Sequence, residues 1–269
     1  MHDENEVKLL SEILPHVAAQ LRGSLGNMRA AVDHLVPEQE GGAGEKELAI
    51  FQQSYYRMMR LTTNLASAPM LLETELFATR NVEWVAWLDE LCRQAQPLAE
   101  EAGVTLTFSC QMRAHVALAH PAHMERLVWN LLSNAMKFTP RGGSVTVTLR
   151  SSGKQLLLSV SDTGCGISEE LQETVFDRYL HTRRMDPLPH GLGLGLPLCR
   201  RIAEGHGGRL VLQSAEGKGT TVTVALPDKR GSEDTLRDIP YHYAGGFQSV
   251  LMELSDALPY KAFRSRHID

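Results

Sequence analysis

The chain has 269 residues, 43% hydrophobic and 22% charged, which is typical of a globular protein with one large domain or two small ones. Its formal net charge of −5 argues against a general nucleic-acid-binding surface. No apolar run is long enough to span a bilayer, and the charged N-terminal region is unlike a signal peptide, so no membrane insertion is expected. The four cysteines are scattered without a CxxC pair, which favours free thiols in the cytoplasm.

Two long amphipathic helices are predicted in the N-terminal part. Apolar residues recur at three- and four-residue steps over 7–35, a spacing typical of a coiled-coil-like seam. Pro15 interrupts this pattern, so it either kinks the helix or begins a second segment. A glycine-rich loop and a second apolar stripe over 48–65 follow. We expect residues 1–75 to form an α-helical hairpin that dimerises into a four-helix bundle; the alternative is a hairpin packed on its own chain.

The pattern then changes to mixed helices and strands over residues 76–227. A helix is expected around 83–101, and alternating residues at 104–110 and 114–119 are typical of strands. After a further helix, the remaining strands come as two hairpins, so we predict an α+β two-layer sandwich with a mixed sheet covered by about three helices. In the tail, 228–269, the sequence FQSVLMELSDAL predicts a short amphipathic helix docked on the domain.

The segment NLLSNAMKFTP, residues 130–140, combines an apolar helical stripe with a row of polar side chains. Asn130, Asn134 and Lys137 recur at steps of four and three, so they share one face of the helix. An ordinary solvated face explains this row as well as a ligand site does. The segments that follow decide between the two.

Three glycine-bearing stretches follow this helix. In DTGCGI, Asp162 comes at a strand end as a fixed hydrogen-bond acceptor, and the glycines permit close approach of a planar ligand. In HGLGLGLPLC, glycines precede a helix, whose N-terminus favours phosphate. In GKGTT, Thr220 would donate to a phosphate. A plain turn, a loop and a hairpin turn are the respective alternatives. His115, His120 and His123 fall at a strand end and a turn, so we do not expect a metal site there.

In this order the motifs resemble the ATP-binding domain of histidine kinases, in the wider GHKL group shared with gyrase and Hsp90-type ATPases (the Bergerat fold). NLLSNAMKF is similar to the N box, DTGCGI to the G1 box, VFDRY to the F box and GLGLGL to the G2 box. The resemblance implies that Asn134 holds the Mg²⁺ of Mg-ATP and that Asp162 accepts from the adenine amino group. It further implies phosphate contacts by Asn130 and Lys137, with Phe138 flanking the nucleotide.

The implied nucleotide-binding residues are Asn130, Asn134, Lys137, Phe138, Asp162, Gly164, Gly166, Ile167, Phe176, Arg178, Tyr179, Gly191, Leu192, Gly193, Leu194, Gly195 and Thr220. A mobile lid is implied over 177–190, where Arg178, Arg183 and Arg184 are candidate phosphate partners. Gyrase-type members carry a glutamate one turn before the metal asparagine, where this chain has Asn130. An amide cannot act as a general base, so slow hydrolysis is expected.

The hairpin resembles the dimerisation and phosphotransfer domain of the same family, whose first helix carries His-Glu-Leu-Arg-x-Pro-Leu. In AQLRGSL, residues 19–25, Ala19 stands in place of the acceptor histidine and Gln20 in place of its acidic neighbour, while Ser24 replaces the proline. Both chemical members of the motif are thereby absent. His16, about one helical turn earlier, is the candidate substitute acceptor; an ordinary surface histidine is the alternative.

The resemblance implies a cytoplasmic protein of two-component signal transduction that binds ATP with Mg²⁺ and nominally transfers phosphate to histidine. Three forms stay open: transfer to a partner's histidine, transfer to His16, or a pseudokinase that uses nucleotide to set its conformation. A regulatory scaffold that binds a response regulator or a partner kinase is the alternative from another class. A serine kinase of the anti-sigma type shares the ATP fold, but the long hairpin argues against it. A homodimer through the hairpin is expected, without nucleic acid.

Overall fold

The computed structural model of the chain describes residues 2–35, 44–72, 75–172, 175–176, 193–232 and 248–264, with the side chains of the first helix described over 14–30 and at 32. Within these ranges, none of the helices combines the length and apolar character that crossing a bilayer requires.

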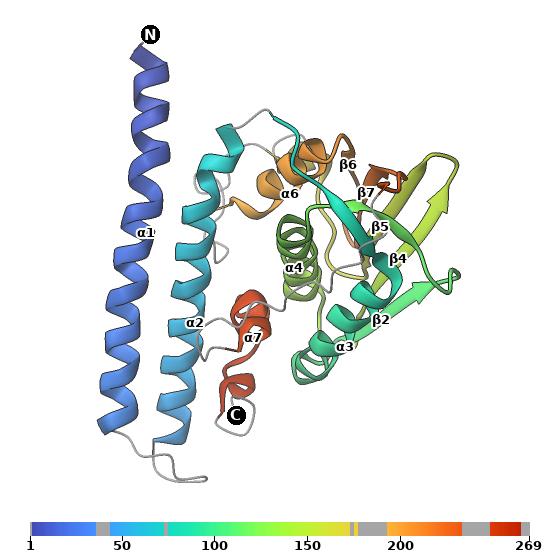
Figure 1. Cartoon of the computed structure of the whole chain (residues 1–269). Coiled ribbons are helices and arrows are strands. Elements are labelled where there is room, and N and C mark those ends of the chain that lie inside the picture. The colour runs from blue at the N-terminus through green and yellow to red at the C-terminus, as the bar shows by residue number, and fades with distance from the viewer. Residues whose placement is uncertain are drawn as a thin grey trace.

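An antiparallel helical hairpin forms the N-terminal part. Helix α1 (His2–Leu35) lies beside α2 (Glu45–Ser67), which leads into the short 3₁₀ helix η1 (Ala68–Leu72). In Figure 1, α1 lies on the outside and α2 lies between α1 and the rest of the molecule. Because α1 continues through Pro15, no second segment begins there.

The second part is a mixed sheet with helices packed on it, as predicted. Its elements are β1 (Arg80–Glu83), α3 (Trp84–Ala102), β2 (Thr105–Cys110), β3 (Val116–Ala119), α4 (Pro121–Phe138), β4 (Ser144–Ser152), β5 (Gln155–Asp162), α5 (Glu169–Gln172), α6 (Gly195–Gly205), β6 (Arg209–Ser214) and β7 (Thr220–Pro227). In the described residues the main sheet has five strands in the order β2-β4-β5-β7-β6, of which β2 and β4 are parallel and the other neighbours antiparallel. The strand expected at 114–119 is β3, but it pairs with β1 in a separate ribbon, and β1 was not predicted.

Local signals set both ends of α4, the helix that carries the polar row. His120 caps its N-terminus by accepting from the backbone N–H of His123 at 3.4 Å, and Pro121 follows as the first helical residue. At the other end, the hydroxyl of Thr139 donates to the carbonyl of Ala135 at 2.6 Å, and Pro140 prevents continuation. The helix therefore ends just after Lys137 and Phe138.

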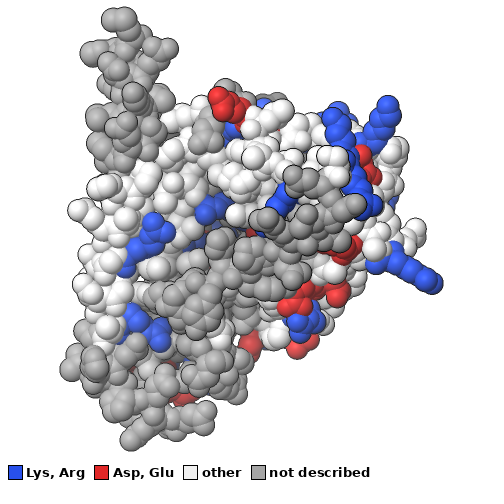
Figure 2. Space-filling model, in the orientation of Figure 1, with Lys and Arg blue, Asp and Glu red and all other residues white. Residues whose placement is uncertain are grey.

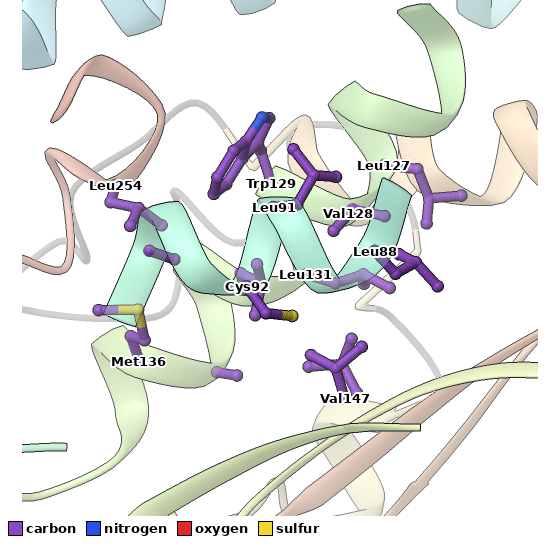
Figure 3. Packing of buried hydrophobic residues seen from close by; sticks show 14 of the residues in the cluster. Leu88, Leu91, Cys92, Leu127, Val128, Trp129, Leu131, Met136, Val147 and Leu254 are labelled. Carbon is purple, nitrogen blue, oxygen red and sulfur yellow. The ribbon is translucent and has the colours of Figure 1, made fainter. Parts of the chain in front are cut away.

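The hydrophobic core fixes which face of α4 meets the sheet. Val145, Val147 and Leu149 of β4 are 0% exposed, as the alternation of that strand predicts. In Figure 3, Val147 lies opposite the cluster formed by leucines of α3 and α4. Burying each such side chain contributes roughly 1.5–3 kcal/mol, so the apolar face of α4 is held inward and its polar row turns elsewhere.

The C-terminal segment packs between the hairpin and the sheet domain. Helix α7 (Ser249–Leu254) contacts α2, α3 and α4, and the 3₁₀ helix η3 (Tyr260–Phe263) contacts α2 and α3. Figure 1 shows this segment beside α2. The predicted short helix is thus present and docked, although its contacts include the hairpin as well as the domain.

The hairpin packs on its own chain and also leaves apolar side chains exposed. Leu14 of α1 contacts a cluster that contains Leu71 and Leu194. By contrast Val17, Leu21 and Met28 on α1 are 38%, 42% and 58% exposed.

Figure 2 shows basic side chains in separate groups over the described part of this face, rather than in one continuous basic patch.

Candidate functional site

A cavity of about 400 Å³ lies between α2, α4, the sheet and the start of α6. Most of the residues that the sequence motifs single out line it. They are Asn130, Asn134, Lys137, Phe138, Asp162, Gly166, Ile167, Gly193, Leu194, Gly195 and Thr220. A volume of this size is typical of pockets that take a small organic ligand.

One end of the cavity is built from the polar row of α4 and the start of α6. Asn130 is only 2% exposed, and its side-chain Nδ2 is buried without a hydrogen-bond partner. A Cβ on Gly195 would lie 3.5 Å from the Asn130 Oδ1 and 3.9 Å from the Asn134 Nδ2. The first turn of α6 therefore faces the two amides, and its exposed N–H groups favour an anion. A buried, unpaired amide is costly unless a ligand completes it.

Asp162 lies at another wall of the cavity, at the end of β5. Its Oδ1 accepts from the backbone N–H of Gly164 at 2.8 Å and of Thr220 at 3.1 Å. Burial raises the pKa of Asp162, and these two hydrogen bonds act in the opposite direction. Gly219 has φ +82°, and a Cβ there would lie 2.0 Å from the Asp162 carbonyl oxygen, so only glycine lets this turn close. The carboxylate is held in one place by backbone from two loops.

Lys137 and Phe138 end the polar row. The Lys137 ammonium lies 5.2 Å from the centre of the Phe138 ring, which is itself 45% exposed. Burial lowers the pKa of Lys137, whereas the nearby Asp256 carboxylate raises it. The ammonium is thus partly desolvated and faces the cavity, where an anionic group would stabilise its charge.

Several other residues predicted for the nucleotide site lie away from the cavity or contact other groups than predicted. Gly164 supports Asp162 rather than lining the cavity, and Phe176 lies 5.9 Å from the guanidinium carbon of Arg200. Thr220 lies beside Asp162, where its hydroxyl is 2.8 Å from that of Ser214. Arg178, Tyr179, Gly191 and Leu192, with the remainder of the 177–190 lid, lie outside the described residues. His16 is exposed on α1 and does not line the cavity.

The sequence analysis did not predict the residues that the hairpin and the C-terminal segment contribute to the cavity. Arg60 and Asn64 of α2, and Asp256 after α7, line the same cavity. Arg60 is one of two arginines in YYRMMRL on α2, and the sequence alone did not indicate that it is buried. Nothing in the spacing of Asp256 indicated its place, because it is 196 residues from Arg60 along the chain.

Three histidines pack around Phe77 away from this cavity. The His120 and His123 rings stack with centres 3.8 Å apart, and the Nε2 of His206 accepts from the His120 backbone N–H at 2.9 Å. His115 instead contacts Asp228 at 2.8 Å. Among the described residues, no group of three or more histidine, cysteine or acidic side chains is arranged to hold a metal ion.

Comparison with known proteins finds a family that matches the part of the chain containing most of this site. Residues 119–230 match the family of histidine kinase-, DNA gyrase B- and HSP90-like ATPases. These residues form a domain of that family. The polar row of α4, Asp162 and the start of α6 all fall inside this ATPase domain.

Curated relatives include histidine kinases from several bacteria. The adaptive-response sensory kinase SasA of Synechococcus sp. (strain JA-3-3Ab) is 29% identical over 224 residues, covering 80% of this chain and 58% of the relative. The histidine protein kinase DivJ of Caulobacter vibrioides is 47% identical over 104 residues, covering 39% of this chain and 17% of the relative. The chain thus spans less than two thirds of the length of these relatives.

Solved structures share the fold. Full-length ShkA, crystallised in complex with AMPPNP, gives a TM-score of 0.66 at 21% identity, covering 84% of this chain and 47% of that one. The catalytic domain of histidine kinase ThkA gives a TM-score of 0.51 at 23% identity, covering 56% of this chain and 97% of that one. At these identities the likeness shows the architecture of the ATPase domain and no more.

Proposed function

We propose that this chain is a Mg-ATP-binding protein of the histidine kinase type that acts in two-component signal transduction in the cytoplasm. The observation that carries the proposal is the single cavity that Asp162 shares with the amides of α4 and the N-terminus of α6. A fixed carboxylate suits the amino group of a purine, and a helix N-terminus suits phosphate. The ATPase-family match supports adenine nucleotide as the ligand.

The residues fit such a ligand in charge and polarity. Asp162 would accept from the adenine amino group, and Phe138 would flank the nucleotide. Asn130, Lys137 and the start of α6 would face the phosphates, where the unpaired Asn130 Nδ2 would gain an acceptor. Asn134 would supply an amide oxygen, a ligand type that Mg²⁺ accepts. When bound, Mg-ATP supplies the transferable phosphoryl group and the metal neutralises part of its charge.

Hydrolysis by this site should be slow. The position that would need a general base is Asn130, and its Oδ1 already accepts from the Arg60 Nη2 at 3.3 Å. An amide cannot take a proton from water, and an adjacent guanidinium disfavours any positive charge that would develop there. Bound nucleotide would therefore persist, as a kinase or a nucleotide-gated switch requires.

The acceptor of the phosphoryl group is proposed from the residues of α1. Ala19 and Gln20 lie exposed on α1, so the surface expected of an acceptor is present without an imidazole or a carboxylate. His16 is exposed on the same helix and is the candidate within this chain. Transfer to a histidine of a partner is the alternative enzyme reading. Ala19 specifically favours a second function, a pseudokinase scaffold that binds a response regulator or a partner kinase according to its nucleotide state.

We further propose three functional regions: 1–75 for dimerisation, 76–227 for nucleotide and 228–269 as a C-terminal tail. Exposed apolar side chains on α1, including Leu21 and Met28, support a homodimer through the hairpin, because such a stripe is stabilised by a second apolar helix face.

The test combines nucleotide binding with phosphate labelling. The purified chain is titrated with ADP and ATP in Mg²⁺, then incubated with γ-labelled ATP, alongside His16→Ala. Binding together with an acid-labile, base-stable label that disappears in His16→Ala would establish a relocated acceptor. Binding without any label would support the pseudokinase or partner-dependent forms. If neither nucleotide binds the folded chain, the proposed function is wrong.

A further inference from the structure

The guanidinium of Arg60 is a buried cation in the wall of the cavity, although it comes from the hairpin. Arg60 is 4% exposed, and its Nη1 donates to the Ser133 hydroxyl at 2.6 Å while its Nη2 donates to the Asn130 Oδ1. Asn130 is also the residue that faces the first turn of α6. The Arg60 guanidinium thus lies at the end of the cavity that the α6 N-terminus and the α4 amides make suitable for an anion.

The C-terminal segment provides the anion that this guanidinium now binds. The Asp256 Oδ2 accepts from the Arg60 Nη1 at 3.0 Å, and Asp256 itself lines the cavity. Side-chain exposure is only 5% for Arg60 and 14% for Asp256, so the pair is poorly screened by water. The Arg60 Nε is buried without a hydrogen-bond partner and lies 4.0 Å from the Glu253 carboxylate, so the guanidinium has unused donor capacity.

Apolar packing holds Asp256 in this position. Leu251 and Leu254 precede it and Leu258 follows it, and each is 2% exposed or less. Figure 3 shows Leu254 within the main hydrophobic cluster, near Trp129 of α4. Backbone carbonyls of the segment also accept from α2: Ser255 from the Arg57 side chain at 3.2 Å and Leu258 from Gln53 at 2.7 Å. The backbone on both sides of Asp256 is therefore held in place, which keeps its carboxylate beside Arg60.

We propose that Arg60 is a phosphate-binding residue that the hairpin contributes to the nucleotide cavity, and that Asp256 occupies it in place of a phosphate. A carboxylate and a phosphate oxygen compete for the same guanidinium donors. The triphosphate of ATP must therefore displace Asp256 from Arg60, which links nucleotide binding to the contact between hairpin, C-terminal segment and ATPase domain. This inference rests on the proposed function, since it assumes that the cavity binds nucleotide.

The test is a double-mutant cycle on ATP affinity, measured by calorimetric titration in Mg²⁺ at fixed ionic strength. Asp256→Asn should bind ATP about tenfold more tightly, because the charged acceptor of the Arg60 Nη1 is removed and Glu253, 4.0 Å from Nε, is the weaker contact. Arg60→Gln should bind ATP more weakly, and adding Asp256→Asn to it should bring a clearly smaller gain than in the original chain, because only the weaker effect of Asp256 on Lys137 is left. Asp89→Asn, the same change at an exposed position on α3 outside the cavity, controls for net charge and should not alter ATP affinity.

Two results would overturn the inference. If folded Asp256→Asn binds ATP no more tightly than the original chain, Asp256 does not compete with phosphate. An equal gain in the Arg60→Gln background would show a general charge effect and would also overturn the inference. If Arg60→Gln fails to fold, Arg60→Lys replaces it, with the gain from Asp256→Asn expected to shrink because an ammonium lacks the guanidinium fork. Normal ADP and ATP binding with no effect of Asp256→Asn would refute the inference alone, whereas no nucleotide binding by any variant would refute the proposed function too.

Discussion

Replacing Asp162 by asparagine tests how the cavity would recognise adenine. The Asp162 Oδ1 accepts from two backbone N–H groups, and an asparagine Oδ1 can keep both of those hydrogen bonds. The substitution therefore preserves the loops and changes the other carboxylate oxygen into an amide donor. A donor in that place opposes the adenine amino group instead of accepting from it.

The expected loss follows from that single contact. A hydrogen bond to a charged acceptor contributes about 1.5–3 kcal/mol, so ADP and ATP affinity should fall roughly ten- to a hundredfold. The preference for adenine over guanine nucleotides should narrow, since the guanine carbonyl can accept from the new amide. Because burial raises the pKa of Asp162, ADP affinity of the original chain should also fall as the pH drops through that raised pKa, and Asp162→Asn should lack this dependence.

Calorimetric titration with ADP, ATP and GDP in Mg²⁺ at several pH values measures all three effects. Asp228→Asn is the matched control, because Asp228 stands directly after β7, much as Asp162 ends β5, but pairs with His115 outside the cavity. Circular dichroism and the urea unfolding midpoint establish that each variant is folded. A folded Asp162→Asn chain that binds ADP within twofold of the original, with its base preference intact, would refute the assignment of Asp162 to the adenine.

Three further predictions concern stability. Burial lowers the pKa of His123 to about 4, with nearby positive groups acting in the same direction. Because the unfolded chain binds a proton at His123 below its unfolded pKa of about 6.5, the contribution of neutral His123 to the unfolding free energy is present above that pH and is lost as the pH falls. The loss is about 2 kcal/mol at pH 5. Urea unfolding against pH should show a shallower acid slope for His123→Gln, and an unchanged slope would contradict this. Gly219→Ala should lower the unfolding free energy by more than 1 kcal/mol relative to Gly217→Ala, since both have positive φ but only the former meets backbone within 2.0 Å; equal costs would show that the contact relaxes. Phe263→Ala should cost about 3–5 kcal/mol because the ring is fully buried, and a loss below 1 kcal/mol would mean that the C-terminal segment is not stably docked.

The sequence by itself determined the features that depend on local periodicity. The steps between Asn130, Asn134 and Lys137 placed three polar groups on one helix face, whatever the helix later packed against. Strand alternation predicted the two hairpins of the main sheet, and the DTGCGI motif predicted that Asp162 stands at a strand end. Each of these follows from backbone geometry over a few residues, so no distant contact was needed to predict it.

Tertiary structure alone decided what closes the cavity. Spacing could not reveal that Asp256 meets Arg60, since the two are joined by packing between α2, α4 and α7 rather than by any repeat along the chain. Tertiary packing likewise places β3 in a ribbon with β1, outside the main sheet, and Thr220 beside Asp162. A helical pattern fixes which residues share a face, but the partner of that face depends on which surfaces bury the most apolar area together. That is a property of the whole fold.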